Sequence, residues 1–437
     1  MINLEKLKTI FVDHDDFIIK ELIFDNMKIN LLGFNTLVDF TKSNLYVRQM
    51  TESSTSVDEL LINISNQLDV DLEQILNAVL EGKLVILLGN GKRNAIVDPF
   101  SHNLTRNVDE PRSENPIHSS SDAFVEDINI NIGLIRKKLS NKQLCHYSYK
   151  IGELDKRRLS LLYINGKAPK ALIKNVSQQL ENIKSDIETV DDLNKYFSQR
   201  KLNIVSHLFS TEIPSNAIHF LKKNRIVFIL DNYPFAIVYP SLFFDMFNVI
   251  SDQNYTNILA FVRQFLRIIG ALSTLILPAL YVSLISVNPE ILKLDLALYI
   301  TANREGIPLS PILETILMVV LIDFIIEAVV RLPKSVGPTI TMVGGIILGQ
   351  GMIEAGLISS LLVIVVTTIV ISSSVLVGVE NSIYMRMLSY PILVLSSIFG
   401  ILGLFIGLTF IIVYLSSLTT NGIPYVAFYI EEKGDIK

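Results

Sequence analysis

The run IIGALSTLILPALYVSLISV, from Ile268 to Val287, decides the fold class. Its twenty residues carry no charge, and about twenty residues of α-helix span the roughly 30 Å hydrocarbon core of a bilayer. We therefore expect a membrane-spanning helix here. Arg263 and Arg267 precede the run, and basic flanks lie preferentially on the cytoplasmic side. The helix is thus predicted to run from inside to outside.

Further apolar segments raise the predicted number of spans to about five, with four or six as alternatives. The second span is ILETILMVVLIDFIIEAVVR, at 312–331. Three uncharged runs supply the others, at 335–353, 357–379 and 390 to about 418. An inward start then places Arg331, Lys334 and Arg386 inside, and Glu354 and the tail 431–437 outside. The mixed stretch 288–311 is expected to form an amphipathic interfacial or re-entrant helix that ends in a turn at 306–311.

Composition agrees with a membrane protein that has a polar first half. The 437 residues are 50% hydrophobic, and the mean hydropathy of +0.43 is high for a soluble protein. Residues 258–437 hold only 9 Lys+Arg and 11 Asp+Glu. The net charge of −5 offers no basic face for a nucleic acid. The first residues are charged, so we expect no cleaved secretory signal and a cytoplasmic location for residues 1–257.

The first half is predicted to be α/β. Apolar runs of strand length occur at 83–89, 159–164 and 225–230, and helical periods occur at 58–80 and 170–183. A polar, turn-rich stretch at 98–121 suggests a subdomain boundary. The expected organisation is two α/β subdomains, 1–105 and 106–257, followed by a transmembrane helical domain, 258–437.

The α/β half shows no pattern typical of catalysis or of cofactor or metal binding. Gly89-Asn-Gly91-Lys92 lacks the full phosphate-loop pattern and is more typical of a hairpin turn. Cys145 is the single cysteine, so neither a disulfide framework nor a Cys-rich metal site is expected. The histidines have no ligand spacing; they are His14, His102, His118, His146, His207 and His219. We therefore expect no enzyme and no cofactor.

Charged residues within the second predicted span are the first functional candidates. Each charge near the bilayer centre costs roughly 2.5–3.5 kcal/mol, so such residues usually face a bundle interior or water. Asp323 is expected near the midplane, and Glu327 and Arg331 follow at spacings of four, the favourable order for an ion pair. Glu314 lies about 180° round the helix from Asp323. The acids either fix packing by bonding to neighbouring helices or line a path for cations.

Polar residues and glycines in the later spans complete the set of candidates. Gln350 and Glu354 follow in the third span, and together with Glu314, Asp323, Glu327 and Arg331 they are the candidates for an ion path or its gating. Glycine pairs spaced by four, which permit close helix packing in lipid, occur at Gly345 and Gly349, and at Gly403 and Gly407.

The sequence also resembles the A subunits of the spore nutrient-germinant receptor family over nearly its whole length. The matching text of the membrane half includes Leu277-Pro278-Ala-Leu-Tyr-Val282, Arg304-Glu-Gly-Ile-Pro308, Arg331-Leu-Pro333 and Gly344-Gly345-Ile-Ile-Leu-Gly349-Gln350. That of the first half includes Asp16-Phe-Ile-Ile-Lys-Glu-Leu22, Asn131 to Arg136 and Asp231-Asn-Tyr-Pro234. Each motif alone is weak evidence for the family, but the occurrence of all of them in the family's order is specific.

The resemblance implies a multi-pass protein of the inner spore membrane. It implies partnership with a permease-like B subunit and a lipoprotein C subunit, and self-association around an ion-conducting path. The leading hypothesis is a nutrient-triggered receptor subunit that forms or gates a cation-release path. Two alternatives stay open: a secondary transporter that uses an intramembrane carboxylate, and a non-conducting membrane scaffold.

Overall fold

The computed structural model describes residues 4–24, 27–53, 57–88, 93–98, 100, 122–183, 185–187, 189–197, 204–249, 252, 254–332 and 337–430. The chain forms two compact units. Unit 1 comprises Met1–Ser241, Thr419–Ile423 and Ala427–Lys437, and unit 2 comprises Leu242–Leu418 and Pro424–Val426. The expected subdomain boundary at 98–121 and the turn at 89–92 lie almost wholly outside the described residues.

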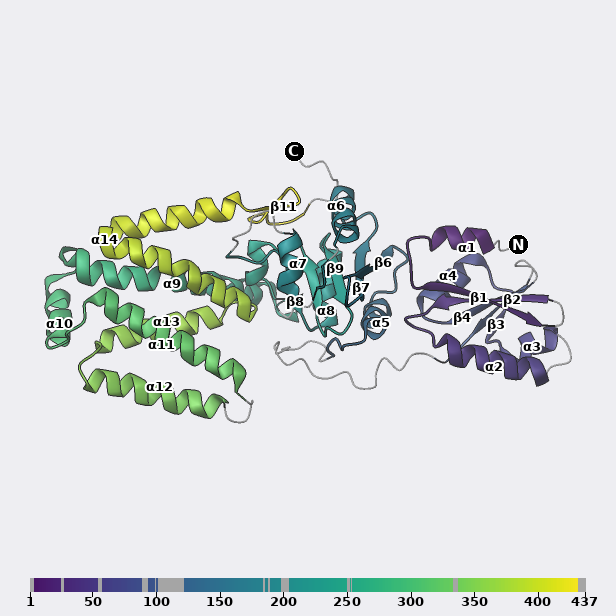
Figure 1. The fold of residues 1–437 in the computed structure, drawn as a ribbon, viewed down its shortest axis with the longest axis horizontal. Helices are drawn as coiled ribbons and strands as arrows, with labels where there is room; N and C mark the ends of the chain where they lie inside the picture. Colours follow the sequence, from purple (N-terminus) through teal and green to yellow (C-terminus); the bar gives the residue numbers. More distant parts are fainter. Residues whose placement is uncertain are drawn as a thin grey trace. The chain divides into compact units, whose positions relative to one another are not determined.

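The first α/β subdomain of unit 1 contains a five-stranded sheet and the helices around it (Figure 1). The strands lie in the order β1-β2-β4-β5-β3, and each neighbouring pair is antiparallel. Aliphatic side chains such as Leu31, Val85 and Ile96 form its buried core. In chain order the elements are α1 (Leu4–Ile10), β1 (Phe17–Phe24), β2 (Met27–Phe34), α2 (Phe40–Ser53), α3 (Val57–Ile64), β3 (Gln67–Leu68), α4 (Leu72–Leu80), β4 (Leu84–Leu88) and β5 (Arg93–Val97).

The second α/β subdomain of unit 1 has its own sheet and its own core. The strand order is β6-β7-β9-β10-β8, again with antiparallel neighbours. Its core includes Ile132, Leu162 and Val227. In chain order the elements are α5 (Ile128–Lys138), β6 (Leu144–Ile151), β7 (Arg157–Ile164), α6 (Lys170–Glu181), α7 (Val190–Phe197), β8 (Phe209–Thr211), α8 (Pro214–Lys222), β9 (Ile226–Leu230) and β10 (Ala236–Tyr239).

The two subdomains are structural repeats of each other. Both run helix, two strands, two helices, strand, helix and two strands, and both sheets have the same strand order. Their turns correspond as well: Asn35 N donates to Asp16 O at 2.9 Å, as Asn165 N donates to Gln143 O at 2.7 Å. After α4 and α8 the chain turns through positive φ at Gly82 and at Asn224. Sequence patterns alone did not reveal this duplication.

Most of the predicted elements of the first half are confirmed. The strands expected at 83–89, 159–164 and 225–230 are β4, β7 and β9, and the helix expected at 170–183 is α6. The helical periods expected over 58–80 are present as two helices, because α3 ends at Ile64 and α4 begins at Leu72. Two aspartates explain the break. Asp69 adopts a positive φ of 48°, and the Asp71 side chain caps α4 by accepting from Gln74 N at 3.0 Å.

Unit 2 is a bundle of helices. In Figure 1 α9 and α11 to α14 run along roughly one direction, and α10 lies across their end. The bounds are α9 (Asn257–Val282), α10 (Leu294–Arg304), α11 (Pro311–Arg331), α12 (Gly337–Glu354), α13 (Ser360–Ser374) and α14 (Val379–Ser417), with a π-helical turn η4 (Ser283–Val287) after α9. The helix expected within 288–311 is therefore present as α10. Its place at a membrane surface stays a prediction.

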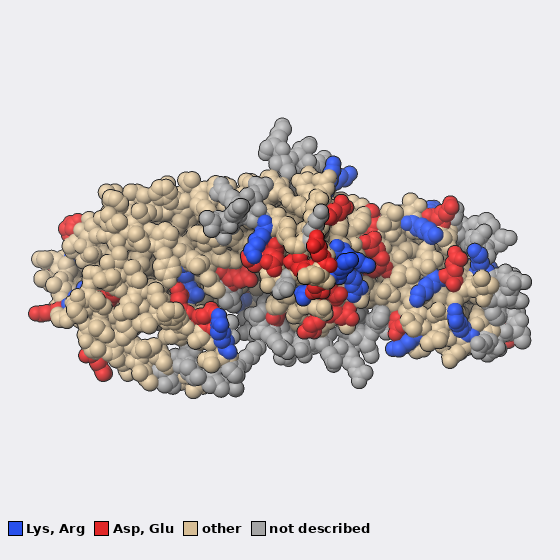
Figure 2. All heavy atoms as spheres, viewed as in Figure 1, with Lys and Arg blue, Asp and Glu red and all other residues tan. Residues whose placement is uncertain are grey.

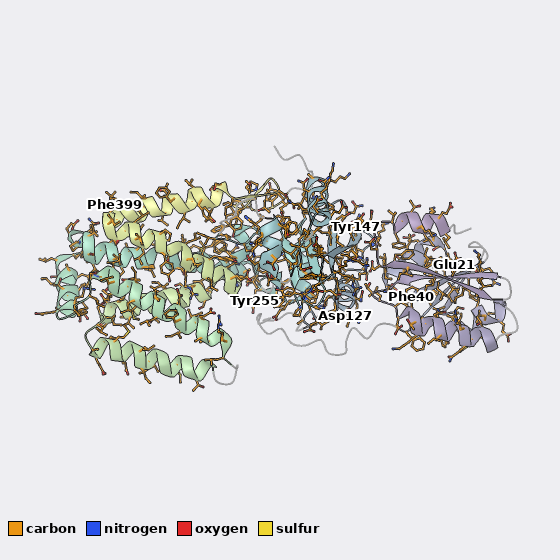
Figure 3. All side chains as sticks on the ribbon, in the orientation of Figure 1. Glu21, Phe40, Asp127, Tyr147, Tyr255 and Phe399 are labelled. Atoms are coloured by element: carbon orange, nitrogen blue, oxygen red, sulfur yellow. The ribbon has the colours of Figure 1, made fainter. Side chains whose placement is uncertain are left out.

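A reversal within α14 changes the predicted span at 390–418. Gly400 has φ 63° and ψ −138°, which breaks the helix into arms 379–399 and 401–417. Phe399, labelled in Figure 3, ends the first arm. Asn288 Oδ1 accepts from Ile401 N at 3.0 Å, and any Cβ at position 400 would collide with it. The expectation of one span here is wrong, because an uncharged run does not show where a glycine reverses the chain.

Most of the described chain after α14 belongs to unit 1, and Pro424–Val426 belong to unit 2. After α14, residues 419–424 form a small hairpin of β11 (Thr419–Thr420) and β12 (Ile423–Pro424). Thr420 Oγ1 lies 2.8 Å from His207 Nδ1, and Asn421 Nδ2 donates to Tyr239 OH at 2.8 Å. Residues 431–437, expected outside the membrane, are not among the described residues.

Two helices of the described chain are long and apolar enough to cross a membrane, Asn257–Val287 and Glu380–Ser417, the latter being the two arms of α14. Ser360–Ser374 is a shorter apolar helix. On the face shown in Figure 2, charged side chains gather over unit 1, whereas the surface of unit 2 is mostly uncharged. The five-span bundle as such is not confirmed.

Candidate functional site

Helix α11 carries four of the candidate residues, and these four take part in three separate ion pairs. One pair lies within α11, and the other two join α11 to other helices. Glu327 and Arg331 form the expected ion pair, with Arg331 Nη2 2.6 Å and Nε 2.9 Å from Glu327 Oε1. Both side chains are exposed, at 60% and 77%. The pairing at a spacing of four is therefore confirmed, and it lies on the outside of the bundle in this copy.

Asp323 has partners on a neighbouring helix. Tyr390 donates its hydroxyl to Asp323 Oδ2, and Arg386 Nε lies 3.4 Å from Asp323 Oδ1, close enough for an ion pair. Arg386 and Tyr390 are one turn apart on α14, so both face α11. The Asp323 side chain is 33% exposed and that of Arg386 is 11% exposed. This geometry corresponds to the alternative in which the acid fixes helix packing.

Sequence reasoning assigned Arg386 only to the cytoplasmic flank and missed this contact. The two residues are 63 positions apart, and nothing local links them. A usable signal was present, because a tyrosine follows Arg386 at a spacing of four, on the same side of a helix. A cation and a hydroxyl on one helix face make a suitable partner for a carboxylate within a membrane.

Glu314 lies in a closed polar cluster at one end of the bundle. Its side chain is completely buried and forms an ion pair with Arg304, whose guanidinium also contacts Tyr281 OH at 3.1 Å. Tyr281 OH lies 2.9 Å from Ser359 Oγ, and Ser359 N donates to Glu314 Oε1. Four helices meet here: α9, α10, α11 and the start of α13. In this copy Glu314 therefore fixes the helix ends and faces no open space.

Gln350 and Glu354 behave differently, because both are exposed on α12. The glycine pair of the same helix is open too, since a Cβ at Gly345 or Gly349 would meet nothing within 4 Å. Among the residues that the structure describes, the expected close packing at this pair is therefore absent. The physical reason is that small residues permit an approach without supplying the second helix.

The other glycine pair confirms the packing prediction. A Cβ at Gly403 would collide with Leu395 O, and one at Gly407 would lie 3.0 Å from the Cα atom of Ile392. The two arms of α14 therefore pack directly on each other. Pro278, a residue of the family motif, is buried within α9. Pro308 lies in the turn after α10 and is exposed.

The basic residues before the first span are also paired. Arg267 Nη2 donates to Asp252 Oδ1 at 3.1 Å, and Arg267 Nη1 donates to Phe247 O at 3.0 Å. Arg263 lies over the ring of Tyr255 at 4.6 Å. These arginines hold the segment that precedes α9 against the start of this helix, in addition to any role in setting the orientation of the helix in the membrane.

Metal-ligating side chains were sought among the described residues. Within the described ranges, no group of three or more His, Cys, Asp or Glu side chains could hold a metal ion. Unit 2 instead combines a buried ion pair, Glu314–Arg304, and a partly buried one, Asp323–Arg386, with long apolar helices, which is typical of a membrane protein with charges held inside its bundle.

Comparison with known proteins identifies the family. The family model described as Bacillus/Clostridium GerA spore germination protein matches residues 5–436. Spore germination protein A1 of Bacillus subtilis (strain 168) is 30% identical over 430 residues, covering 97% of this chain and 88% of that protein. Spore germination protein GerLA of Bacillus cereus is 30% identical over 362 residues, covering 81% of this chain and 73% of that protein. The chain belongs to the GerA spore germination protein family.

One solved structure is also similar, the N-terminal domain of the A subunit of the Bacillus megaterium spore germinant receptor GerK3. It is 18% identical, with a TM-score of 0.41, and the match covers 55% of this chain and 94% of that chain.

Proposed function

We propose that this chain is the A subunit of a spore germinant receptor and that it forms or gates a nutrient-triggered cation path in the inner spore membrane. The match of the GerA family model to residues 5–436 carries the proposal. A permease-like B subunit and a lipoprotein C subunit are the proposed partners. Unit 1 lies in the cytoplasm in this scheme, and unit 2 lies in the membrane.

The connectivity of unit 2 supports six crossings. Unit 1 holds both Met1–Ser241, which precede unit 2, and Thr419–Ile423 and Ala427–Lys437, which follow α14, so an even number of crossings is required if unit 2 spans the membrane. Helices α9, α11, α12 and α13 and the two arms of α14 supply six segments. The chain then returns to the cytoplasmic side, which replaces the outside position expected for the tail.

The pairing of charges supports a path between copies of the chain. On α11, Glu314, Asp323 and Glu327 each have a cationic partner within the same copy. Gln350 and Glu354 are exposed on α12 and are free to face a shared path. The open glycine face of α12 offers a surface on which a second copy can approach closely.

Deletion and complementation of the gene test this proposal. Spores that lack the gene are exposed to a panel of nutrients, and cation release is followed with an ion-selective electrode. We expect loss of the response to at least one nutrient, and its recovery when the gene is restored. Unchanged release for every nutrient would refute a receptor role. Loss of assembly with normal release by the remaining subunits would favour the scaffold alternative.

A further inference from the structure

A short segment of the first α/β subdomain, Asp13–Asp16, is bound to the edge of the second. Asp15 N donates to His146 O at 3.0 Å, and His146 N donates to Asp13 O at 2.9 Å. These two bonds form a parallel bridge to β6, the edge strand of the second sheet. The hydroxyl of Tyr147, labelled in Figure 3, donates to Asp13 Oδ1. The junction thus begins with backbone pairing between the repeats.

A buried ion pair crosses the same junction. Arg136 of α5 donates from Nε to Asp16 Oδ2 at 2.7 Å and from Nη2 to Asp16 Oδ1 at 2.6 Å. Thr36 Oγ1 donates to Asp16 Oδ2 at 2.8 Å, and His146 Nδ1 lies 3.3 Å from Asp16 Oδ1. Asp16 is 6% exposed and Arg136 is 2% exposed. A two-point charged contact of this kind fixes orientation as well as distance.

The Asp16 carboxylate stays charged at neutral pH. Burial by itself raises the pKa of Asp16, but Arg136 and, to a lesser degree, His146 outweigh burial and hold this pKa well below its usual range. The Arg136 guanidinium also lies over the ring of Phe34 at 4.0 Å. Removing the carboxylate charge would therefore leave a buried cation whose remaining partners are weaker.

Apolar packing contributes only part of the junction. Leu134 of α5 joins the core of the first subdomain, while Ile132 and Ile135 join the core of the second. Beside the ion pair lies a cavity of about 130 Å³, lined by polar groups such as Asn35 and Ser160 and by apolar groups such as Ile128. The facing surfaces are therefore not held by tight packing alone.

The internal repeat shows that the fold of one subdomain does not require the carboxylate. The matching hydrogen bonds of Asn35 and Asn165 place Asp16 at the position of Gln143 in the second subdomain. In the same register Arg136 corresponds to Thr9 of α1, a residue on the surface. In this register, each of these two charges therefore occurs in only one of the two copies of the fold, at the junction between Asp13–Asp16 and the second subdomain.

We propose that the Asp16–Arg136 ion pair is a charge lock that fixes the two α/β subdomains as one body. Unit 1 then transmits a movement as a whole and does not open and close between its two halves. The proposal rests on the geometry of unit 1 and does not depend on the proposed function of the chain.

The test uses the full chain in lipid nanodiscs and the variant Asp16→Asn, which keeps the size of the side chain and removes its charge. Amide hydrogen exchange is measured at Asp15 and His146, whose N–H groups form the bridge. Strands β4 and β9 serve as internal references for the two cores. The matched control is Glu21→Gln in the same subdomain, which breaks an exposed pair with Lys28.

We expect exchange at the two bridge amides to rise at least about a hundredfold in Asp16→Asn, with β4 and β9 unchanged, and no change in Glu21→Gln. A hundredfold rise corresponds to about 2.8 kcal/mol in the opening free energy.

Spin labels at Leu45 and Leu154, exposed sites on the two subdomains, give a second readout in a Cys145→Ser background. Their distance distribution should broaden only in Asp16→Asn. Unchanged bridge exchange, or an equal rise in both cores, would overturn the lock.

Discussion

The contact between Asp323 and the Arg386–Tyr390 face of α14 gives the sharpest prediction about unit 2. We expect Asp323→Asn and Arg386→Gln each to destabilise the packing of α11 on α14, and the double variant to lose less than the sum. The side-chain oxygen of asparagine can still accept the hydrogen bond from the Tyr390 hydroxyl, so Asp323→Asn tests the effect of the negative charge alone. Glu327→Gln on the same helix is the control, because it removes a carboxylate whose pair lies on the outside of the bundle.

The distance sets the magnitude. At the 3.4 Å between Arg386 Nε and Asp323 Oδ1, two unit charges attract by about 5 kcal/mol with an effective dielectric constant of 20. Desolvation of both groups and the one-third exposure of Asp323 reduce this gross figure. We therefore expect each single variant to lose about 1–3 kcal/mol and the coupling energy to be at least about 1 kcal/mol.

Reversible unfolding of the reconstituted protein gives the free energy of unfolding of the four proteins in this double-mutant cycle: the unchanged chain, the two single variants and the double variant. Cation release from spores, normalised to the amount of assembled receptor, is measured in parallel and should change by less than about twofold in Asp323→Asn, a difference of about 0.4 kcal/mol in a rate-limiting barrier. Additive losses of stability would refute the coupling. Release slowed about tenfold or more with normal stability would instead place Asp323 on the conducting path.

Three further results are expected. Gly400→Ala should lower the amount of folded protein sharply, because the new Cβ would collide at the reversal of α14, whereas Gly349→Ala should have little effect on a single copy; membrane immunoblots compare the two. Burial, with Arg136 as a second cause, lowers the pKa of His14 to about 4. Because the unfolded chain binds this proton near pH 6.5, the stability of unit 1 should fall from pH 6.5 to pH 4 by up to about 3 kcal/mol, and His14→Asn should flatten this dependence in amide-exchange measurements. A thiol at the exposed position 429, introduced as Tyr429→Cys, should react with an impermeant reagent only from the cytoplasmic side; reaction from outside would refute six crossings.

Local patterns were sufficient to predict the elements that depend on local physics. Apolar runs between turns identified β4, β7 and β9, and the spacing of four identified the pair of Glu327 and Arg331. The glycines at 403 and 407 indicated a close helix contact that the structure contains. In each case the residues that decide the feature are neighbours in the sequence.

Features that depend on distant partners could not be predicted in this way. Asp323 meets Arg386, and Asp16 meets Arg136, across 63 and 120 positions. The reversal at Gly400 depends on Asn288, which lies 113 positions from its partner Ile401. Composition does not show which residues of two distant segments lie opposite each other. The duplication of the α/β fold could not be seen in the sequence, because the two copies share their strand order and turn geometry but have no obvious sequence motif in common.

The exposed face of α12 allows the most direct test of the central claim, that copies of this chain form or gate a cation path. The measurement is the initial rate of nutrient-triggered cation release from spores that carry Glu354→Gln, compared with spores that carry Glu305→Gln, which removes an exposed carboxylate from the turn after α10. Both are normalised to receptor amount. The account predicts release slowed at least about tenfold by Glu354→Gln, equal to about 1.4 kcal/mol on the rate-limiting barrier, and no change with Glu305→Gln. Equal release rates in the two variants would contradict it.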